Sequence, residues 1–191
     1  MSFEALTAVA SVGTLFVIGA TAIFAAIQLR HARAGNQISA VMNLGHVMQS
    51  SEFQNCRRFI RDELPSKLRD PLFRQSLNKV PVGEAGRPLV LVANFYEELG
   101  AFVKRGIIDA DMACDLWSAQ VTGDWDQLSP AIAIIRREQG PATFENFEYM
   151  VVLAERWTDR YASGTFPSSL HRKPIEDVWL VEDRMQGGVP K

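Results

Sequence analysis

The run ALTAVASVGTLFVIGATAIFAAIQL, residues 5–29, contains no ionisable side chain and lies between Glu4 and Arg30. About 20 apolar residues, at a rise of about 1.5 Å each, let a helix cross a hydrocarbon core about 30 Å thick. This run is longer, and its few polar members are Thr7, Ser11, Thr14, Thr21 and Gln28. The sequence therefore predicts a transmembrane anchor over residues 1–33.

A cleaved signal peptide is the alternative for this end of the chain, and three features oppose it. No lysine or arginine precedes the run, the run exceeds the roughly 7–15 residues of a signal peptide's apolar region, and the positive charges lie behind it. These charges are Arg30, His31 and Arg33. Because basic flanks favour the cytoplasmic side, we expect a single-pass protein of the cell (inner) membrane, with its N-terminus outside and its domain in the cytoplasm.

The rest of the chain has the composition of one globular domain. Of the 191 residues of the whole chain 47% are hydrophobic and 22% are charged, and the net charge of −2 gives no electrostatic case for a nucleic-acid partner. Cys56 and Cys114 lie far apart, and neither has a second cysteine or a histidine at metal-ligand spacing. We therefore expect two free thiols, no metal and no cofactor.

Helical periodicity dominates the sequence after the anchor, and no alternating pattern typical of strands occurs. Residues 34–50 predict a helical stalk, with a bend or break at Gly35–Asn36. Further helices are predicted over residues 52–64, 72–77, 89–105, 109–121 and 144–162. The expected fold class is all-α, with one transmembrane helix followed by a small cytoplasmic helical bundle over residues 51–163.

Two local signals divide the region between residues 109 and 141. Thr122–Gly123 is expected to end one helix, and Ser129–Pro130 to begin or kink another, because proline suits the first turn of a helix. Gly106 is expected to follow the end of helix 89–105 as its C-terminal glycine.

The arginines Arg57, Arg58 and Arg61 share the polar face of helix 52–64. We expect a solvated face with Asp62 and Glu63 nearby; the alternative is a contact with anionic headgroups or with the carboxylates of a partner.

The tail, residues 164–191, is expected to be flexible or docked. Burial of Trp179 favours docking on the chain's own domain, and a linear motif for a partner is the alternative.

Aromatic, acidic and glycine positions in the second half carry a resemblance to a known family. They are FYEELG at 95–100, KRGIID at 104–109, Trp117, Gly123, Trp125, Arg136, Arg137 and FENFE at 144–148. In these positions, and up to about residue 161, the chain resembles the bacterial domain of unknown function 4760 family. The resemblance implies an N-terminal membrane helix followed by a small helical cytoplasmic domain, and no activity is established for the family.

Two acidic pairs are the candidates for chemistry, Glu97 with Glu98 and Glu145 with Glu148, the second pair three residues apart on one helix face. A di-metal centre in a helical bundle places a histidine three residues after such a glutamate, and that histidine is missing here. A nucleophile turn of the G-x-S-x-G kind and a phosphate-binding loop are missing as well. We expect the glutamates to pair across helix interfaces with basic residues, among them Arg136 and Arg137.

The sequence thus favours a membrane-anchored helical interaction module that acts by binding an unidentified protein. The alternative is a small membrane-anchored enzyme that uses the four helix-borne glutamates.

Small and polar residues recur in steps of four and three along one face of the membrane run. The face includes Thr7, Ser11, Thr14, Thr21 and Ala25. Because small side chains and hydroxyls drive helix association in lipid, this face predicts a homodimer through the membrane helix. The alternative is that each threonine bonds its own i−4 carbonyl.

Overall fold

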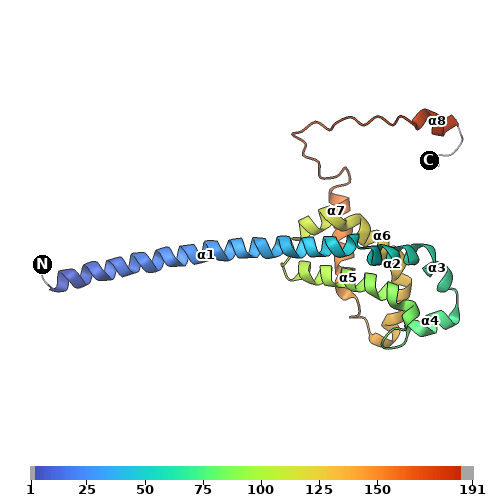
Figure 1. Ribbon diagram of the computed structural model, residues 1–191, viewed down its shortest axis with the longest axis horizontal. Helices are drawn as coiled ribbons and strands as arrows, with labels where there is room; N and C mark the ends of the chain where they lie inside the picture. The colour runs from blue at the N-terminus through green and yellow to red at the C-terminus, as the bar shows by residue number, and fades with distance from the viewer. Residues whose placement is uncertain (1–2, 186–191) are drawn as a thin grey trace. The chain divides into compact units, whose positions relative to one another are not determined.

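The computed structural model describes residues 3–185, which form helices, turns and loops without any β-strand in that range (Figure 1). The all-α prediction is confirmed. In the first helix, side chains are described for Phe3 and from Gly13 onward. The chain divides into two compact units, residues 1–160 and 161–191, and each is described by itself.

The first unit begins with one long helix, α1 (Phe3–Gln49), of 47 residues. It passes through Gly35 and Asn36, so the break predicted there does not occur (Figure 1). A glycine inside a helix costs about 1 kcal/mol relative to alanine. The helical turns on both sides of Gly35 outweigh that cost, and the last turns are fixed by the domain.

The two ends of α1 differ in their surroundings. Large apolar side chains such as Leu15, Phe16 and Phe24 are exposed in the first half. By length and composition, α1 is the one helix among the described residues that is apolar enough to cross a membrane. Near the other end, Leu44 and Met48 are only 4% and 8% exposed and belong to the domain core. The segment expected to be a stalk therefore contributes to the core.

Short helices come next, each begun by local chemistry. They are α2 (Ser51–Asp62), α3 (Leu64–Lys67), α4 (Pro71–Leu77) and the 3₁₀ helix η1 (Glu84–Gly86). The predicted cap of α2 is confirmed, because the Ser50 hydroxyl accepts a hydrogen bond from the Phe53 N–H at 3.2 Å. The Gln54 amide donates to the carbonyl of Met48 at 2.7 Å and fixes the turn between α1 and α2.

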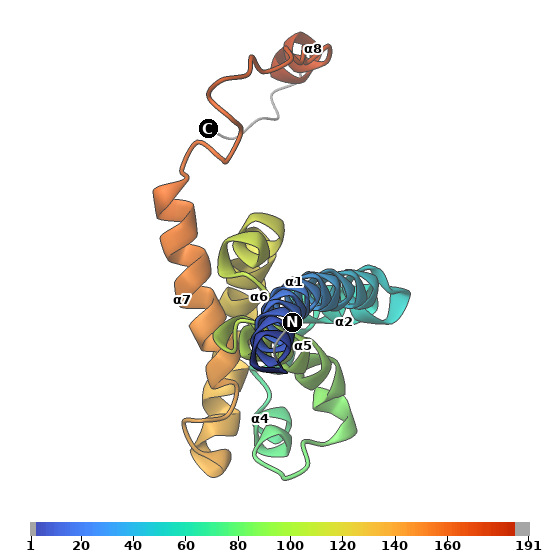
Figure 2. The same cartoon turned by 90° about the vertical axis from the view of Figure 1, so that its left-hand side faces the viewer.

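Three longer helices form the centre of the domain: α5 (Arg87–Lys104), α6 (Ala110–Gln139) and α7 (Glu145–Arg160). Figure 2 looks along α1 and shows α6 and α7 beside α5. Gly106 adopts a φ of 67° just after α5, which confirms its predicted role as the C-terminal glycine. Asp109 caps α6 by accepting from the N–H of Met112 at 2.9 Å, also as predicted.

Helix α6 corrects the prediction of two separate segments, because it continues through Gly123 and Pro130. These residues cost a helix interior about 1 and about 3 kcal/mol. Buried residues on both sides, among them Val121, Leu128 and Ile132, each gain about 1.5–3 kcal/mol by leaving water. Tertiary packing therefore overrides the local breaking signals.

Aromatic rings join the central helices in the core. The ring of Tyr96 stacks on that of Phe147 with centroids 4.6 Å apart, and Trp125 meets Phe147 edge-on at 4.9 Å. Phe53 of α2 packs on Phe95 of α5 at 4.8 Å. Such pairs contribute about 0.5–1.5 kcal/mol beyond the burial of their area.

The second unit is a loop followed by α8 (Leu180–Met185). Within it, the Arg172 guanidinium lies 4.9 Å from the centroid of the Phe166 ring and donates to the carbonyl of Ser163 at 3.1 Å. The docking of this tail, and of its Trp179, stays a prediction.

Candidate functional site

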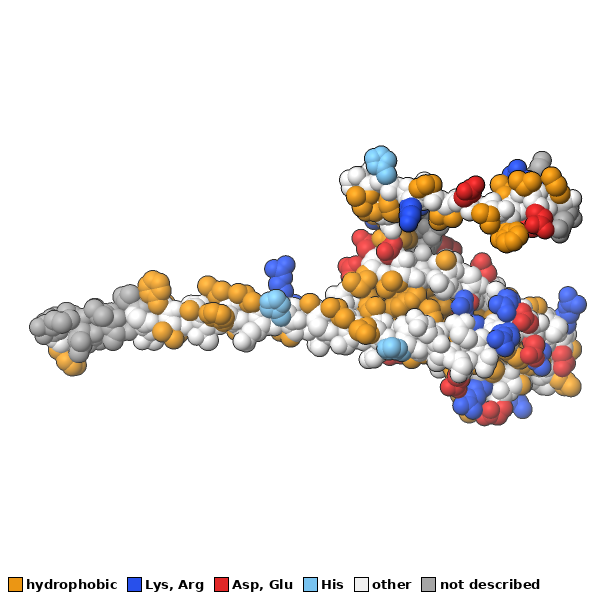
Figure 3. All heavy atoms as spheres, turned by 45° about the horizontal axis from the view of Figure 1, so that its top comes forward, with side chains coloured by type: hydrophobic (Ala, Val, Ile, Leu, Met, Phe, Trp, Pro, Cys, Tyr) orange, Lys and Arg blue, Asp and Glu red, His pale blue; other side chains and the backbone are white. Residues whose placement is uncertain are grey.

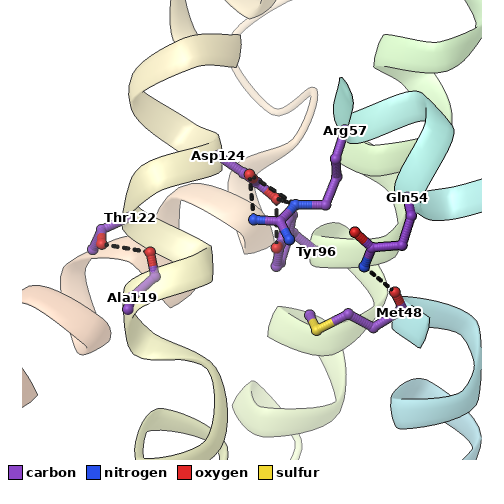
Figure 4. Close-up of polar contacts among 7 residues, drawn as sticks. All are labelled: Met48, Gln54, Arg57, Tyr96, Ala119, Thr122 and Asp124. Atoms are coloured by element: carbon purple, nitrogen blue, oxygen red, sulfur yellow. Dashed lines mark hydrogen bonds and ion pairs between the residues drawn. The ribbon is translucent and has the colours of Figure 1, made fainter. Parts of the chain in front are cut away.

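A buried carboxylate on α6 organises the polar site of the domain. Asp124 is 5% exposed and is the single buried charged residue among the side chains described. Its Oδ2 accepts from Arg57 Nε at 2.8 Å, and its Oδ1 accepts from Arg57 Nη2 at 3.0 Å. The Tyr96 hydroxyl donates to Oδ2 at 2.7 Å (Figure 4). Helices α2, α5 and α6 thus meet at one carboxylate.

The electrostatics of this cluster keep its donors protonated. Burial raises the pKa of Tyr96 far above its usual range, and the charge and hydrogen bond of Asp124 raise it further. Burial alone would lower the pKa of Arg57, but the hydrogen bond and charge of Asp124 outweigh it and leave that pKa above its ordinary value. The guanidinium is therefore held charged and in a fixed position.

An arginine pocket opens over this cluster. We use this name for the hollow of about 210 Å³ lined by Gln54, Arg57, Arg58, Arg61, Asp124 and Gln127. Asp124 engages Nε and Nη2 of Arg57, which leaves Nη1 for another acceptor. The pocket therefore suits a carboxylate or a phosphate, since hydrogen bonds from a guanidinium to either group are charge-assisted.

The structure partly corrects the expected solvated arginine face. Arg58 and Arg61 are exposed, and Arg61 pairs with Asp62 at 2.8 Å, as expected of such a face. Arg57 instead turns inward to Asp124. The sequence held a signal for this pairing, because a carboxylate between Val121 and Leu128 lies on the buried stripe of α6 and needs a partner.

The first predicted glutamate caps a neighbouring helix. Glu97 Oε2 accepts from the backbone N–H groups of Asn146 and Phe147 at 3.0 and 2.9 Å, and Oε1 accepts from Asn146 Nδ2 at 2.8 Å. A carboxylate at a helix N-terminus satisfies free N–H groups and complements the helix dipole. Glu97 therefore holds the start of α7 against α5.

Gly100 serves the same contact. A methyl group at this position would collide with the backbone carbonyl of Asn146. Together with Tyr96 and Glu97, it gives the segment at 95–100 a role in packing α5 against α6 and α7.

The remaining predicted contact residues have different fates. Glu148 Oε2 lies 2.8 Å from Arg136 Nη2, so the predicted pairing of a glutamate with Arg136 across a helix interface is observed. Glu145 pairs with Lys104 at 3.3 Å instead. Glu98 and Arg137 are exposed.

Arg136 also shapes the loop before α7. Its Nε donates to the carbonyl of Thr143 at 2.9 Å, and its Nη2 donates to that of Phe144 at 3.3 Å. Phe144 has a φ of 58°, an uncommon conformation for a residue other than glycine.

The described part of the chain holds no group of three or more histidine, cysteine or acidic residues able to hold a metal, so the four glutamates do not form such a group.

The predicted packing face of α1 is described from Gly13 onward, so the side chains of Thr7 and Ser11 lie outside the described residues. Thr14 and Ala25 are exposed. The Thr21 hydroxyl donates to its own i−4 carbonyl, that of Val17, at 2.7 Å. For Thr21 the own-carbonyl alternative is therefore observed. The predicted topology residues Arg30, His31 and Arg33 lie further along α1 and are exposed.

These features define an all-α domain that follows a long, apolar N-terminal helix and whose helices α2, α5 and α6 are joined by hydrogen bonds to one buried carboxylate. The chain belongs to the family described as Domain of unknown function (DUF4760), whose sequence model matches residues 15–157. The predicted family is thereby confirmed, over a range that runs from α1 into α7. No curated protein and no solved structure matches the chain.

Proposed function

We propose that this protein is a single-pass membrane protein whose helical domain acts by binding a protein partner. The observation that carries the proposal is the exposed first half of α1, where Leu15 and Phe16 are 70% and 76% exposed. Figure 3 shows hydrophobic side chains along this part of the helix, away from the charged surface of the domain. Each large apolar side chain gains about 1.5–3 kcal/mol by leaving water, and a bilayer supplies the required surroundings.

The charges around α1 support an inner-membrane protein with the N-terminus outside and the domain in the cytoplasm. Arg30, His31 and Arg33 lie on the domain side of the apolar run, and Glu4 lies on the other side. Basic residues next to a membrane helix remain on the cytoplasmic side. Because α1 continues unbroken into the core, the domain is then held close to the membrane surface.

The arginine pocket supports binding as the activity. Asp124 fixes Arg57 in place, so little conformational freedom is lost when an acidic side chain of a partner pairs with the free edge of the guanidinium. Arg58 and Arg61 add positive charge at the rim. A partner with an exposed aspartate or glutamate is the chemistry that this pocket fits.

Three of the four glutamates of the enzyme alternative are used in other ways, and the fourth, Glu98, is exposed. Glu97 caps α7, while Glu145 and Glu148 form ion pairs with Lys104 and Arg136. A general acid or base needs a carboxylate that reaches a substrate, and these three are engaged in helix packing. The arrangement therefore favours binding over catalysis.

Affinity capture of the full chain from detergent-solubilised membranes tests both parts of the proposal. The pocket variant is Arg58→Glu with Arg61→Glu, and the control is Arg69→Glu with Arg137→Glu, which makes the same change in charge at exposed sites outside the pocket. We expect a protein that is captured by wild type and control and lost from the pocket variant. Equal capture by all three chains would contradict the pocket's role, and recovery of the wild type in the soluble fraction would contradict the anchor.

A further inference from the structure

Two neighbouring arginines of α1 and one from a distant part of the sequence meet at one hollow beside α1. Arg30 and Arg33 come from α1, and Arg105 comes from the segment between α5 and α6. The hollow has a volume of about 620 Å³ and is also lined by Gln37 and Ile107; its other lining residues are alanine, asparagine and glycine. The lining thus carries three positive charges and no carboxylate.

The turn after α5 places Arg105 and Ile107 at the hollow. Gly106 adopts a left-handed φ of 67°, which glycine accepts without strain. The N–H of Ile107 donates to the carbonyl of Phe102 at 2.9 Å and closes the turn. Ile108 is fully buried beneath it, whereas Ile107 is 42% exposed. The buried Ile108 thus anchors the turn to the core, and the turn holds Arg105 and Ile107 at the surface.

Helix α1 lies beside the same region of the domain. The side-chain amide of Gln37 lies 3.9 Å from the sulfur of Met112, in the first turn of α6. A second hollow, lined by residues of both helices, runs between α1 and α5 and includes Glu98 and Phe102. The arginines of α1 and the turn at Gly106 thus lie side by side within the first unit.

The place of this hollow along α1 indicates its ligand. Arg30 directly follows Leu29, where the 25 residues without an ionisable side chain end. At about 1.5 Å per residue this run extends about 38 Å, more than the roughly 30 Å of a hydrocarbon core, so Arg30 falls at the depth of the headgroups. Guanidinium groups bind phosphate in bidentate geometry, and an exposed isoleucine suits the boundary between headgroups and acyl chains.

We propose that this hollow, the headgroup site, binds the phosphate of an anionic phospholipid in the leaflet next to the domain. The proposal rests on the membrane anchoring proposed above. It adds a direct contact between the domain and the bilayer, because Arg105 and Ile107 belong to the domain and not to the anchor. The uncompensated positive charge selects an anionic lipid over a zwitterionic one.

Native mass spectrometry of the full chain in detergent micelles tests the headgroup site. The probes are dioleoyl phosphatidylglycerol and dioleoyl phosphatidylcholine at equal mole fraction. We expect a retained phosphatidylglycerol adduct that exceeds the phosphatidylcholine adduct and that falls roughly five-fold in Arg105→Gln, since one basic residue near an anionic surface contributes about that factor. Arg137→Gln, an exposed arginine near the far end of α6, is the matched control and keeps the adduct.

Several outcomes overturn the proposal. Equal adducts of the two lipids, or an adduct unchanged in Arg105→Gln, would contradict the headgroup site. If Arg105→Gln melts at a lower temperature than the wild type, Arg33→Gln is the second variant. Displacement of phosphatidylglycerol by millimolar inorganic phosphate would assign the site to free phosphate instead. Carbonate extraction of membranes tests separately whether α1 anchors the chain. A chain that stays in the membrane without preferring phosphatidylglycerol overturns the headgroup site alone, and a chain that is extracted overturns the anchor.

Discussion

The two halves of α1 share one secondary structure and have opposite surroundings. From Gly13 to Leu29 the helix exposes its apolar side chains, whereas its last turns bury Leu44 and Met48 in the domain. Helix propensity does not distinguish the halves, since both are helical. The difference lies in the medium that covers the apolar side chains: the domain covers one face of the second half, and the first half requires a medium that the described part of the chain does not supply.

The largest expected effect comes from placing charge in the exposed half. An arginine near the centre of a membrane helix costs about 3 kcal/mol, so Leu15→Arg with Ile18→Arg costs about 6 kcal/mol of insertion. We expect this variant to leave carbonate-washed membranes, with the melting temperature of its domain unchanged. Its control is Ile38→Arg with Met42→Arg, two exposed apolar positions beyond the run, which should stay in the membrane. Retention of both variants would remove the distinction between the halves.

Truncation tests the buried half. A chain that starts at Gly35 lacks the exposed run and keeps Leu44 and Met48, so we expect it to be soluble and helical by circular dichroism. A chain that starts at Ser50 loses both side chains, at about 2 kcal/mol each, or about 4 kcal/mol together. For a domain of this size we expect its melting temperature to fall by about 10–20 °C relative to the longer chain. Equal melting would show that the end of α1 adds nothing to the core, and aggregation of the longer chain would show that the domain needs a membrane or partner cover.

A smaller effect is expected where the domain depends on its polar cluster. Tyr96→Phe removes the hydrogen bond to buried Asp124 and should cost about 1–3 kcal/mol in urea unfolding of the detergent-solubilised chain. Tyr149→Phe, at a half-buried position, is the control and should change stability by less than about 0.5 kcal/mol.

The stability of the wild type and that of Tyr96→Phe should depend differently on pH. The pKa of Tyr96 is raised in the folded chain above its unfolded value of about 10, so its contribution is complete below pH about 10 and is lost as the pH rises further. Burial also raises the pKa of Cys114, to about 11. The loss of stability that follows from this thiol at high pH occurs equally in the wild type and in Tyr96→Phe. The wild type should therefore lose stability more steeply than Tyr96→Phe above pH about 10. Parallel curves would contradict the role of the tyrosine proton.

The smallest expected effect concerns self-association through the exposed half. Hydroxyls that bond between membrane helices contribute roughly 0.6 kcal/mol each, so Thr14→Leu with Thr21→Leu should weaken a dimerisation reporter by roughly eight-fold or less. The bond from Thr21 to its own chain at Val17 makes the lower end of that range the expectation. Val12→Leu with Ile23→Leu should leave the signal unchanged. If both double variants respond alike, the anchor is monomeric.

Helix ends could be predicted where one residue's own chemistry decides them. Ser50 and Asp109 cap their helices because their side-chain oxygens accept from a backbone N–H three residues on. Gly106 ends α5 because glycine adopts a positive φ without strain. The same local logic was wrong in ending a helix at Gly123 and in beginning one at Pro130, because burial along α6 exceeds the cost of these two residues. Local signals fix helix ends on the surface and lose to packing in the core.

The polar sites were harder to predict because their partners come from separate helices. Arg57 and Asp124 lie 67 positions apart, and Glu97 and Phe147 lie 50 apart. Spacing along one helix says which face a residue occupies and not which residue faces it. The sequence therefore identified the glutamates and Arg136 as contact residues. The capping role of Glu97 and the inward orientation of Arg57 could be seen only in the structure.

Protease protection in spheroplasts of a bacterial host tests the central claim most directly, using the full chain with a different epitope at each end. An anchored protein with a cytoplasmic domain should pellet with the membranes, lose its N-terminal epitope to external protease, and keep its domain intact until detergent is added. Digestion of the domain from outside would contradict the orientation. A chain found in the supernatant after carbonate washing would contradict the anchor itself.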